Sequence, residues 1–440
     1  MKLKCLGAGQ EVGRSGILIK TDNENILFDY GLKLHPKFKN QKNKNLSEKY
    51  KIEEEYTEEP LKIKEHLDAV ILSHAHLDHS GDIPSLYKKG DPNLFLTEAT
   101  LELSNLLWLD TLKIAKYDDK EPPFNKDEIK FANKAAFYLN LRETIEISKY
   151  SRLTFYDAGH ISGSVISILE TEGKKIMYTG DIRSEKSTLF KGFDRNLPQV
   201  DILITESTYG NKNHKSRENL EKELISEIKE TIENGHKVIL AAFAIERTQE
   251  LIALLDKYKI NAPIYVDGMG IKASRIFADH KEYLNDLKSF KKALDRTELI
   301  TNHRTRKDIL RTPEPAIIIT TAGMLEGGPV MLYLKEFGNN KDNKLILTGY
   351  QVDGTNGDRL LKTGKLYIDK ELYKINCQIK HVSISAHLDQ KELFELIDIV
   401  KPKKIICVHG DSKTIEEFRK EINKKKIENI APKVGDIFDI

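Results

Sequence analysis

The sequence predicts an α/β protein in which one α/β domain is inserted into another. The N-terminal third has the pattern of short strands and hairpins, whereas from about Tyr209 helix-period segments alternate with short apolar strands. Strand and helix patterns that complete the first domain return near the C-terminus. A chain of 440 residues also exceeds the size at which one hydrophobic core keeps growing, so two domains are expected.

The N-terminal third begins with a hairpin. Residues 15–20 and 26–29 flank a polar turn at 22–25, which is the pattern of two strands joined by a short loop. Further strands are expected, in order, at residues 68–73, 94–97, 152–156, 165–170, 175–179 and 201–205.

Residues 33–60 interrupt this pattern with charged runs. Lysines 37, 39, 42 and 44 precede glutamates at 53–55, 58 and 59. We expect a solvated surface insertion, because charge runs of this kind usually face water. The alternative hypothesis is a flap that contacts RNA.

After Tyr209 the pattern is typical of a parallel βαβ sheet. Helix-period segments at 216–233, 246–257 and 270–280 alternate with fully apolar strands at 237–242, 263–266, 316–320 and 344–347. The C-terminal part then adds the segment 390–400, a strand at 404–408 and a helix that begins at Asp411 or Ser412.

Composition limits the class of protein. Hydrophobic residues make up 39% and charged residues 31%, which indicates a soluble protein with a large core. The net charge of +2 means that a nucleic acid would have to meet local basic patches. An apolar segment long enough to span a membrane and a signal-peptide pattern are both absent from the sequence. The three separated cysteines fit a reducing cytoplasm and are expected to be buried.

One motif points directly to a metal site. His74, His76, Asp78 and His79 fall within six residues, directly after the apolar run 69–72. A strand that ends in this way delivers three imidazoles and a carboxylate within one turn of backbone. Nitrogen and oxygen donors of this kind bind zinc and similar cations.

Three further strand-end residues join this motif. His160 lies in a glycine-rich turn, Asp181 follows Gly180 at the end of a strand, and Asp29 follows another strand. Gly-His and Gly-Asp turns are common, so either residue alone would be weak evidence. With the cluster at 74–79 present, strand ends on one rim of a sheet make them candidate ligands. Asp29 suits a supporting position, where a carboxylate orients a ligand imidazole.

In this order, the motifs resemble the metallo-β-lactamase fold. Two later motifs, Ser-Ala-His-Leu-Asp at 385–389 and Val-His-Gly-Asp at 408–411, narrow the resemblance to the β-CASP branch of nucleic-acid nucleases. The stretch 205–209 resembles the acidic motif of that branch. Residues 7–15, 322–329 and 349–355 look like archaeal homologues of the endonuclease subunit of the cleavage and polyadenylation specificity factor. The resemblance covers essentially the whole chain.

The resemblance implies a four-layer αββα metallo-β-lactamase domain with an inserted parallel-sheet β-CASP domain. The expected division is 1–208 and 363–440 for the first domain and 209–362 for the β-CASP domain. The chain begins at its catalytic core, so it resembles a short form without KH domains. RNase J usually has Ser-Gly-His-Ala where this chain has Ser385, Ala386 and His387, which disfavours RNase J without excluding its activity.

The resemblance also implies a mechanism with two zinc ions. The first ion would be held by His74, His76 and His160, the second by Asp78, His79 and His409, and Asp181 would bridge them. The ions would activate water for attack on phosphorus. His387 would then protonate the leaving 3′ oxygen while Glu206 orients it, to give 3′-hydroxyl and 5′-phosphate ends. The histidine at 409 favours RNA over DNA as the substrate.

Contacts to RNA phosphates are expected in the inserted domain. Gly327 and Gly328 precede Pro329 and a helix at 330–337, and a glycine-rich helix start presents free N–H groups to an anion. A plain tight turn is the alternative. Arg247 at a helix start could also reach a phosphate, and a solvated surface position is equally compatible with the sequence. Trp108 and its leucine neighbours are expected in the core.

The leading hypothesis is therefore a cytoplasmic zinc-dependent endoribonuclease for single-stranded RNA, in RNA processing, 3′-end formation or decay. A 5′-to-3′ exoribonuclease of RNase J type is the first alternative, and a non-catalytic scaffold subunit is the second. The resemblance further implies RNA-processing partner proteins and a homodimer element at 426–440. The remaining histidines are expected on the surface or in the core: His35, His66, His214, His236, His280, His303 and His381.

Overall fold

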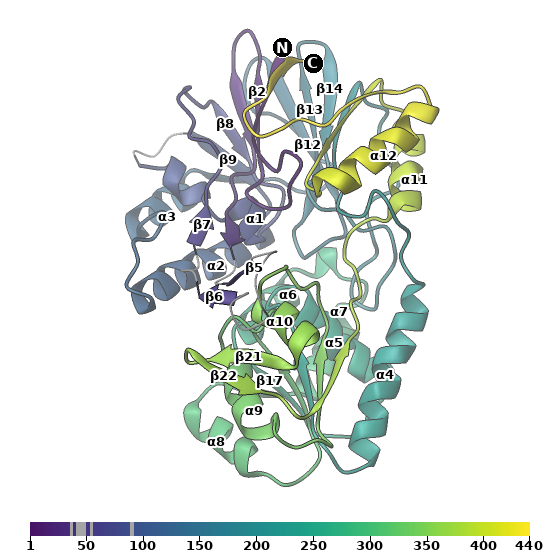
Figure 1. The fold of residues 1–440 in the computed structure, drawn as a ribbon. Coiled ribbons are helices and arrows are strands. Elements are labelled where there is room, and N and C mark those ends of the chain that lie inside the picture. The colour runs from purple at the N-terminus through teal and green to yellow at the C-terminus, as the bar shows by residue number, and fades with distance from the viewer. Residues whose placement is uncertain (36–37, 41–49, 53–55, 89–91) are drawn as a thin grey trace.

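The computed structural model describes residues 1–35, 38–40, 50–52, 56–88 and 92–440. Two units form it, an upper one that contains both chain termini and a lower one built from the middle of the sequence (Figure 1). Much of the charged stretch predicted at 33–60 lies outside the described residues. Its described backbone forms two small pairs, β4 (Lys33–His35) with β7 (Tyr56–Glu58) and β5 (Phe38–Asn40) with β6 (Tyr50–Ile52).

The upper unit contains two seven-stranded sheets. In sheet order, the first consists of β10 (Ala136–Tyr138), β9 (Asn93–Leu96), β8 (Ala69–Ile71), β3 (Asn25–Phe28), β2 (Gly16–Lys20), β1 (Lys2–Gly7) and β26 (Ile437–Asp439). The second consists of β11 (Thr144–Glu146), β12 (Ser151–Asp157), β13 (Val165–Thr171), β14 (Lys174–Tyr178), β15 (Ile202–Glu206), β24 (Lys404–Val408) and β25 (Glu428–Ile430).

Apolar side chains join these sheets and their helices into four layers. Phe28, Ile71 and Phe155 belong to the cluster between the two sheets. Trp108 of α2 (Glu98–Tyr117) is fully buried, as predicted, in the cluster that packs α2 and α3 (Lys126–Lys134) on the first sheet. Phe418 belongs to the cluster that packs α11 (Gln390–Val400) and α12 (Ser412–Lys424) on the second sheet. The αββα order expected from the sequence is therefore present.

The lower unit is built on a six-stranded sheet whose neighbouring strands are all parallel. Its strand order is β18 (Glu298–Ile300), β17 (Ile264–Asp267), β19 (Ile317–Thr320), β16 (Val238–Ala241), β20 (Lys344–Leu347) and β23 (Gln378–His381). The helices around it are α4 (Arg217–Glu233), α5 (Arg247–Lys257), α6 (Gly270–Asp279), α7 (Leu287–Asp295), α8 (His303–Arg311), α9 (Val330–Phe337) and α10 (Asn356–Thr363). The predicted parallel βαβ rhythm is thus confirmed.

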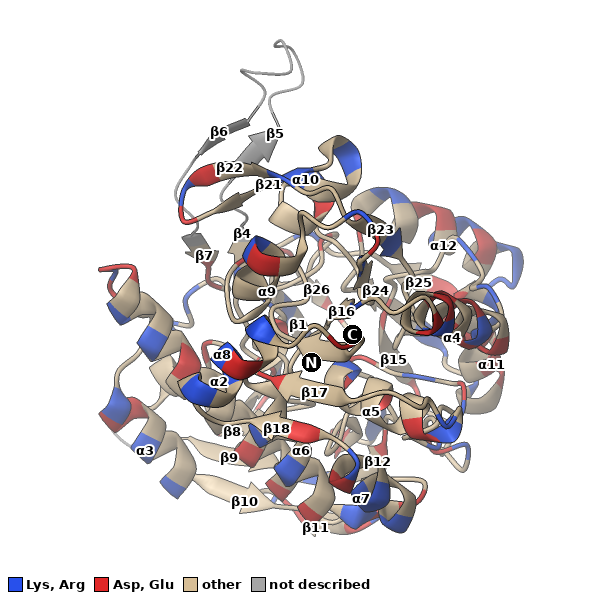
Figure 2. Cartoon of the chain, turned by 90° about the horizontal axis from the view of Figure 1, so that it is seen from below, with Lys and Arg blue, Asp and Glu red and all other residues tan. Residues whose placement is uncertain are grey.

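The three remaining short helices and one hairpin complete the described elements. They are α1 (Leu77–Ser80), η1 (Ile83–Leu86), η2 (Lys281–Tyr283) and the pair β21 (Lys365–Ile368) with β22 (Glu371–Lys374). Among the described helices, none is long and apolar enough to cross a membrane. Basic and acidic residues are interleaved on helices such as α2, α3 and α12, in keeping with the small net charge (Figure 2).

The sheet pairings bear on the expected domain boundaries. β23 begins at Gln378, beyond the boundary placed at residue 362, and it pairs in parallel with β20 of the lower sheet. By strand pairing the inserted layer therefore extends to His381. Sequence periodicity missed this strand, because three of its four residues are exposed and it has no apolar run. The boundaries themselves stay a prediction.

The C-terminal segment returns to the edges of the upper unit. β24 pairs with β15 in parallel and sets Glu206 opposite Val408, the residue before His409. β25 and β26 then lie at the outer edges of the two seven-stranded sheets. The dimer element expected at 426–440 stays a prediction, since the structure contains a single chain.

Candidate metal centre

Strand ends of both upper sheets bring the predicted metal ligands together. From the first sheet, β8 leads to His74 and His76, and α1 directly afterwards carries Asp78 and His79. The second sheet supplies the other candidates from the carboxyl ends of its strands, namely His160, Asp181 and His409.

The first group consists of His74, His76, His160 and Asp181, with one donor atom of each within 4.8 Å of the others. Nε2 of His160 lies 3.1 Å from Nδ1 of His76 and 3.7 Å from Oδ2 of Asp181. Nε2 of His74 lies 3.6 Å from the same oxygen. The imidazoles of His74 and His160 thus face Asp181 rather than the solvent.

The second group consists of Asp78, His79, Asp181 and His409. Oδ1 of Asp181 lies 3.3 Å from Nε2 of His79 and 3.4 Å from Nδ1 of His409. Nε2 of His409 is 3.2 Å from Oδ2 of Asp78. Asp181 therefore turns one carboxylate oxygen to each group, which is the geometry of a bridging ligand.

Unpartnered buried atoms test whether these residues fit a metal. Nε2 of His74 and Oδ1 of Asp181 are buried and have no hydrogen-bond partner among the described residues. Burial, together with the charge of His79, lowers the pKa of His74 well below its usual value. Burial also lowers the pKa of His76 and His160, so these imidazoles are neutral and keep a lone pair for a cation. Nitrogen and oxygen donors at this spacing fit zinc.

Asp29 lies behind the metal-ligand cluster and contacts one of its histidines, His79. It is fully buried, and its carboxylate accepts hydrogen bonds of 2.7 Å from the backbone and hydroxyl of Ser73 and from the hydroxyl of Tyr178. Nδ1 of His79 lies 2.7 Å from the same carboxylate. This contact turns Nε2 of His79 toward Asp181, as expected of a residue that orients a metal ligand.

Gly180 allows the two strand ends to approach closely. It has a φ of +52°, and a Cβ at this position would lie 2.6 Å from Oγ of Ser73. A side chain here would push Asp181 away from His74, so the Gly-Asp turn is a steric requirement of the site.

The candidate catalytic pair lies beside the cluster. Nδ1 of His387 is 2.9 Å from Oε2 of Glu206 and 3.9 Å from Oδ2 of Asp181. Although burial disfavours a charged imidazole, the carboxylates of Glu206 and Asp181 raise the pKa of His387 to about 9. His387 is therefore positively charged at neutral pH. Nε2 of His387 stays available to a substrate, because the carboxylate of Glu206 binds Nδ1.

The inserted unit turns the carboxyl ends of its strands toward this centre. β23 leads into the segment that carries His387, and all neighbouring strands run parallel to it. The loops after β16, β19 and β20 therefore lie at the same edge. Parallel α/β sheets bind their ligands at that edge.

Two of the predicted phosphate contacts lie in these loops. Gly327 and Gly328 have φ values of +126° and +75° between β19 and α9. Pro329 stands just before the first residue of α9 rather than at it. Whether they bind phosphate stays a prediction.

Arg247, predicted as a phosphate contact with a solvated surface position as the alternative, is buried. Its side chain is only 4% exposed, and Nη2 donates to the carbonyl of Ile384 at 2.5 Å and lies 3.1 Å from Oε2 of Glu246. The solvated position is wrong, because α5 packs its first turn against the segment before His387 instead of against solvent.

His214 is a contact that the sequence did not reveal. Its Nε2 lies 3.1 Å from the carbonyl of His387, and its ring packs edge-on against Tyr209 at 4.6 Å between centroids. His381, the other histidine near this segment, lies 3.0 Å from the carbonyl of Gly349. Neither residue stands in a motif with a second donor, so no local signal could have found them. The three cysteines are free and buried, as predicted.

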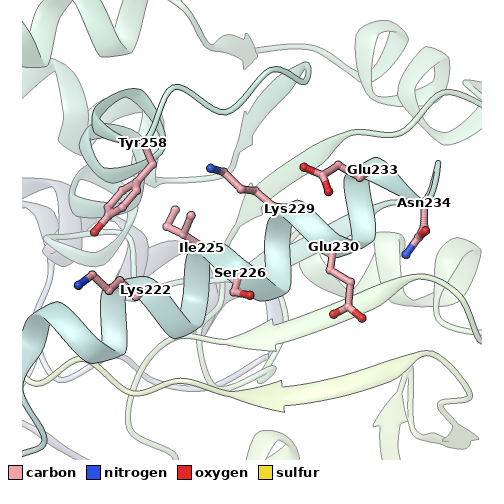
Figure 3. A pocket seen from close by; sticks show the side chains of 8 residues that line it. All are labelled: Lys222, Ile225, Ser226, Lys229, Glu230, Glu233, Asn234 and Tyr258. Atoms are coloured by element: carbon pink, nitrogen blue, oxygen red, sulfur yellow. The ribbon is translucent and has the colours of Figure 1, made fainter.

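One hollow of the inserted unit is separate from this centre. About 450 Å³ in volume, it runs along α4 and is lined by Lys222, Ile225, Ser226, Lys229, Glu230, Glu233, Asn234 and Tyr258 (Figure 3). None of these residues belongs to the metal cluster. The hollow therefore has no part in the chemistry described here.

Comparisons with family models agree with this geometry. The metallo-beta-lactamase superfamily matches residues 10–226, the Beta-Casp domain matches 248–360, and a Zn-dependent metallo-hydrolase RNA specificity domain matches 372–432. A protein of Methanocaldococcus jannaschii called "Probable RNase MJ4" is 36% identical over 99% of both chains. The chain belongs to the β-CASP family of metallo-β-lactamase-type ribonucleases. It is a metal-dependent ribonuclease by that membership.

Other β-CASP relatives carry different names. An "RNase J-like protein" of the same organism is 36% identical over the whole of this chain and 99% of its own length. The "Transcription termination factor FttA" of Methanosarcina mazei is 34% identical over 98% of this chain and 70% of its own. A crystal structure of a protein of unknown function from Enterococcus faecalis shares the fold, with a TM-score of 0.63, 14% identity and coverage of 100% and 99% of the two chains.

Proposed function

We propose that this β-CASP protein is a zinc-dependent endoribonuclease that hydrolyses single-stranded RNA to 3′-hydroxyl and 5′-phosphate ends. The observation that carries the proposal is the position of His387, which is paired with Glu206 and lies 3.9 Å from the carboxylate shared by both metal groups. An acid and a metal cluster at this separation can serve the two ends of one phosphodiester. The proposed role is RNA processing, 3′-end formation or decay. The name of the relatives called "Transcription termination factor FttA" supports 3′-end formation.

The proposed ligands divide between two zinc ions. His74, His76 and His160 would hold one ion, while Asp78, His79 and His409 would hold the other, with Asp181 shared. When bound, the ions would lower the pKa of a water molecule and neutralise charge on the phosphate oxygens. Asp29 would keep His79 in the tautomer that presents Nε2 to its ion.

His387 would supply the proton that the leaving oxygen needs. A 3′ alkoxide is a poor leaving group, so protonation by a positioned acid accelerates its departure. Glu206 is only 1% exposed and also accepts a hydrogen bond from the backbone of Ile182 at 3.1 Å, which fixes the carboxylate that holds Nδ1 of His387. Glu206 would thereby fix the orientation of the His387 ring and so the direction in which Nε2 presents its proton.

The first test uses purified protein with 5′-labelled linear RNA and a circular RNA of the same unstructured sequence. His76→Ala and His387→Ala are run in parallel. We expect cleavage of the circle by the native protein and loss of that cleavage in both variants. An intact circle together with linear RNA degraded from its 5′ end would contradict the endonuclease proposal.

That second outcome would support a 5′-to-3′ exonuclease, the activity class suggested by the RNase J-like relative. The two modes are separated by comparing linear RNAs with a 5′-monophosphate and a 5′-hydroxyl. An endonuclease cleaves both at similar rates, whereas a 5′ exonuclease depends on the end group.

We also propose the domain division 1–208, 209–362 and 363–440, and a homodimer formed through residues 426–440. Ile437 in the edge strand β26 is 56% exposed, which makes it available to a second chain. Sedimentation of the native protein and of Ile437→Lys should separate a dimer from a monomer. A native protein that sediments as a monomer would exclude the dimer.

A further inference from the structure

The segment that carries His387 has no regular structure of its own. Residues 382–388 leave β23, cross to the upper unit and reach α11 without forming a helix or strand. Residues 381–385 also border an open hollow of about 230 Å³. Sheet pairing flanks His387 at β23 and at an isolated bridge between Asp389 and Tyr209, and between these points side-chain contacts hold the segment.

Three side chains bind consecutive parts of this segment. Nη2 of Arg247 donates to the carbonyl of Ile384 at 2.5 Å. Nδ1 of His160 lies 2.8 Å from the carbonyl of Ala386, and Nε2 of His214 lies 3.1 Å from that of His387. The two histidines belong to the upper unit and to the connection out of it, whereas Arg247 comes from α5 of the inserted unit.

A buried ion-pair network fixes Arg247 in turn. Nη2 of Arg247 lies 3.1 Å from Oε2 of Glu246, whose other oxygen pairs with Arg183. Arg183 follows Asp181 by two residues. The side chains of all three network members are at most 5% exposed. One chain of contacts thus joins the loop of the bridging carboxylate, the inserted helix and the segment of His387.

The backbone at this point is strained. Glu246 has φ +77° and ψ −62°, and the amide of Arg247 donates to the carbonyl of Ile245 at 3.1 Å. These are the features of a γ-turn with a positive central φ, which is rare for a residue with a side chain. Such a conformation persists when the surroundings impose it, and here it directs Glu246 and Arg247 inward together.

We propose that Arg247 is a positioning residue for the proton donor of the reaction. It holds the carbonyl of Ile384, so that His387 reaches Glu206 through Nδ1 and presents Nε2 to the departing oxygen. This inference rests on the proposed function, since it assumes that His387 protonates the leaving group. Arg247 itself contacts neither the metal groups nor the reacting atoms.

The test compares two substrates that differ in their need for an acid. The leaving group of an unstructured RNA oligonucleotide is a 3′ alkoxide, which requires protonation. The leaving group of bis(p-nitrophenyl) phosphate is a stable phenolate, which does not. Arg247→Lys keeps the charge but loses the planar fork, and Arg247→Gln removes the charge. A displacement of the acid by about 1 Å costs roughly 100-fold in rate.

We expect both Arg247 variants to lower kcat on RNA by about 10- to 100-fold, with KM within about twofold. Cleavage of bis(p-nitrophenyl) phosphate should stay within about threefold of the native rate, and His387→Ala should show the same selectivity. Arg217→Lys is the matched control. Arg217 is also buried and binds Glu221 and Glu250, of which Glu250 lies 3.9 Å from Nη1 of Arg183, but its hydrogen bonds among the described residues do not go to the segment 382–388.

Melting temperature and bound zinc are measured for every variant. Equal losses on both substrates, or the RNA-selective loss in Arg217→Lys, would overturn the role of Arg247. If His387→Ala is selective and the Arg247 variants are not, the proposed function stands and this inference fails. If His387→Ala loses both substrates equally, His387 is not the proton donor and the proposed function must change.

Discussion

Two buried clusters of charge lie at the junction of the units, and they satisfy their charges in different ways. In the metal centre, Asp181 and His74 keep buried polar atoms without a hydrogen-bond partner among the described residues. The interface network consists of Arg183, Arg217, Glu246, Arg247 and Glu250. In it, Glu250 is equally buried but accepts from Nη2 of Arg217 at 2.7 Å, from Oγ of Ser187 at 2.8 Å and from the amide of Thr188 at 3.1 Å.

The difference shows which buried charges serve the metal centre and which hold the two units together. Burying a charge is costly unless a partner compensates for it. The carboxylates of the interface network have arginine partners, so the network contributes to joining the units, although Nε and Nη1 of both Arg183 and Arg247 have no hydrogen-bond partner among the described residues. In the metal centre the carboxylate of Asp181 faces the imidazoles of His79 and His409, and its Oδ1 still has no hydrogen-bond partner among the described residues, which suits a bound cation. Each prediction below removes one kind of compensation.

The largest effect is expected from Asp181→Ala. Because this carboxylate faces both metal groups, its loss should remove bound metal and lower RNA cleavage by more than about 1,000-fold, the several kcal/mol that metal ions supply. Elemental analysis of the purified protein should find two zinc ions per native chain and fewer in the variant. Asp194→Ala, which removes the partner of the exposed Arg142, is the control. Unchanged metal content in Asp181→Ala would contradict the bridging assignment.

The interface network should respond in stability instead of metal content. Glu250→Gln leaves Arg217 with one carboxylate fewer in a buried site, and breaking a buried pair costs about 3–5 kcal/mol. Urea unfolding measures this loss. Glu218→Gln, which breaks an exposed pair with Lys222 on the same helix, should leave the midpoint unchanged. Similar midpoints for the two variants would show that the network does not stabilise the fold.

Asp29→Ala tests the support beneath the metal centre. Without this carboxylate, Nδ1 of His79 loses its partner, and such losses lower metal affinity by about 10- to 100-fold. Competition with a chromogenic chelator gives the affinity. Tyr178→Phe removes one of several donors to Asp29 and should have a smaller effect. A larger effect of Tyr178→Phe would mean that the hydroxyl does more than hold Asp29.

The sequence predicted the fold and the metal centre far better than the supporting contacts. His74 to His79 form one local motif after an apolar strand, and the strand ends at His160 and Asp181 have Gly-rich turns that mark them. The contact of Arg247 joins it to a carbonyl 137 residues away, and that of His214 spans 173 residues. Neither contact produces a periodicity or a motif in the sequence, because one partner is a backbone carbonyl, which every residue has. Sequence periodicity did not predict strand β23 for a related reason, since its pairing with β20 depends on the neighbouring strand and not on a pattern in its own residues.

Asp82 provides the smallest and most specific test of the comparison, because it is buried and makes no ion pair among the described residues. Its Oδ1 lacks a hydrogen-bond partner among the described residues, and burial raises its pKa to about 8. A carboxyl whose folded pKa is raised binds its proton more tightly when folded. It therefore costs nothing below the unfolded value near pH 4, and its cost is fully present above pH 8. Asp82→Asn should stabilise the protein by about 1 kcal/mol at pH 8 and by nothing near pH 4, measured as urea midpoints at both pH values. An equal gain at both would mean that packing and not ionisation sets the cost of this residue, and a loss at pH 8 would mean that the ionised carboxylate has a compensating partner.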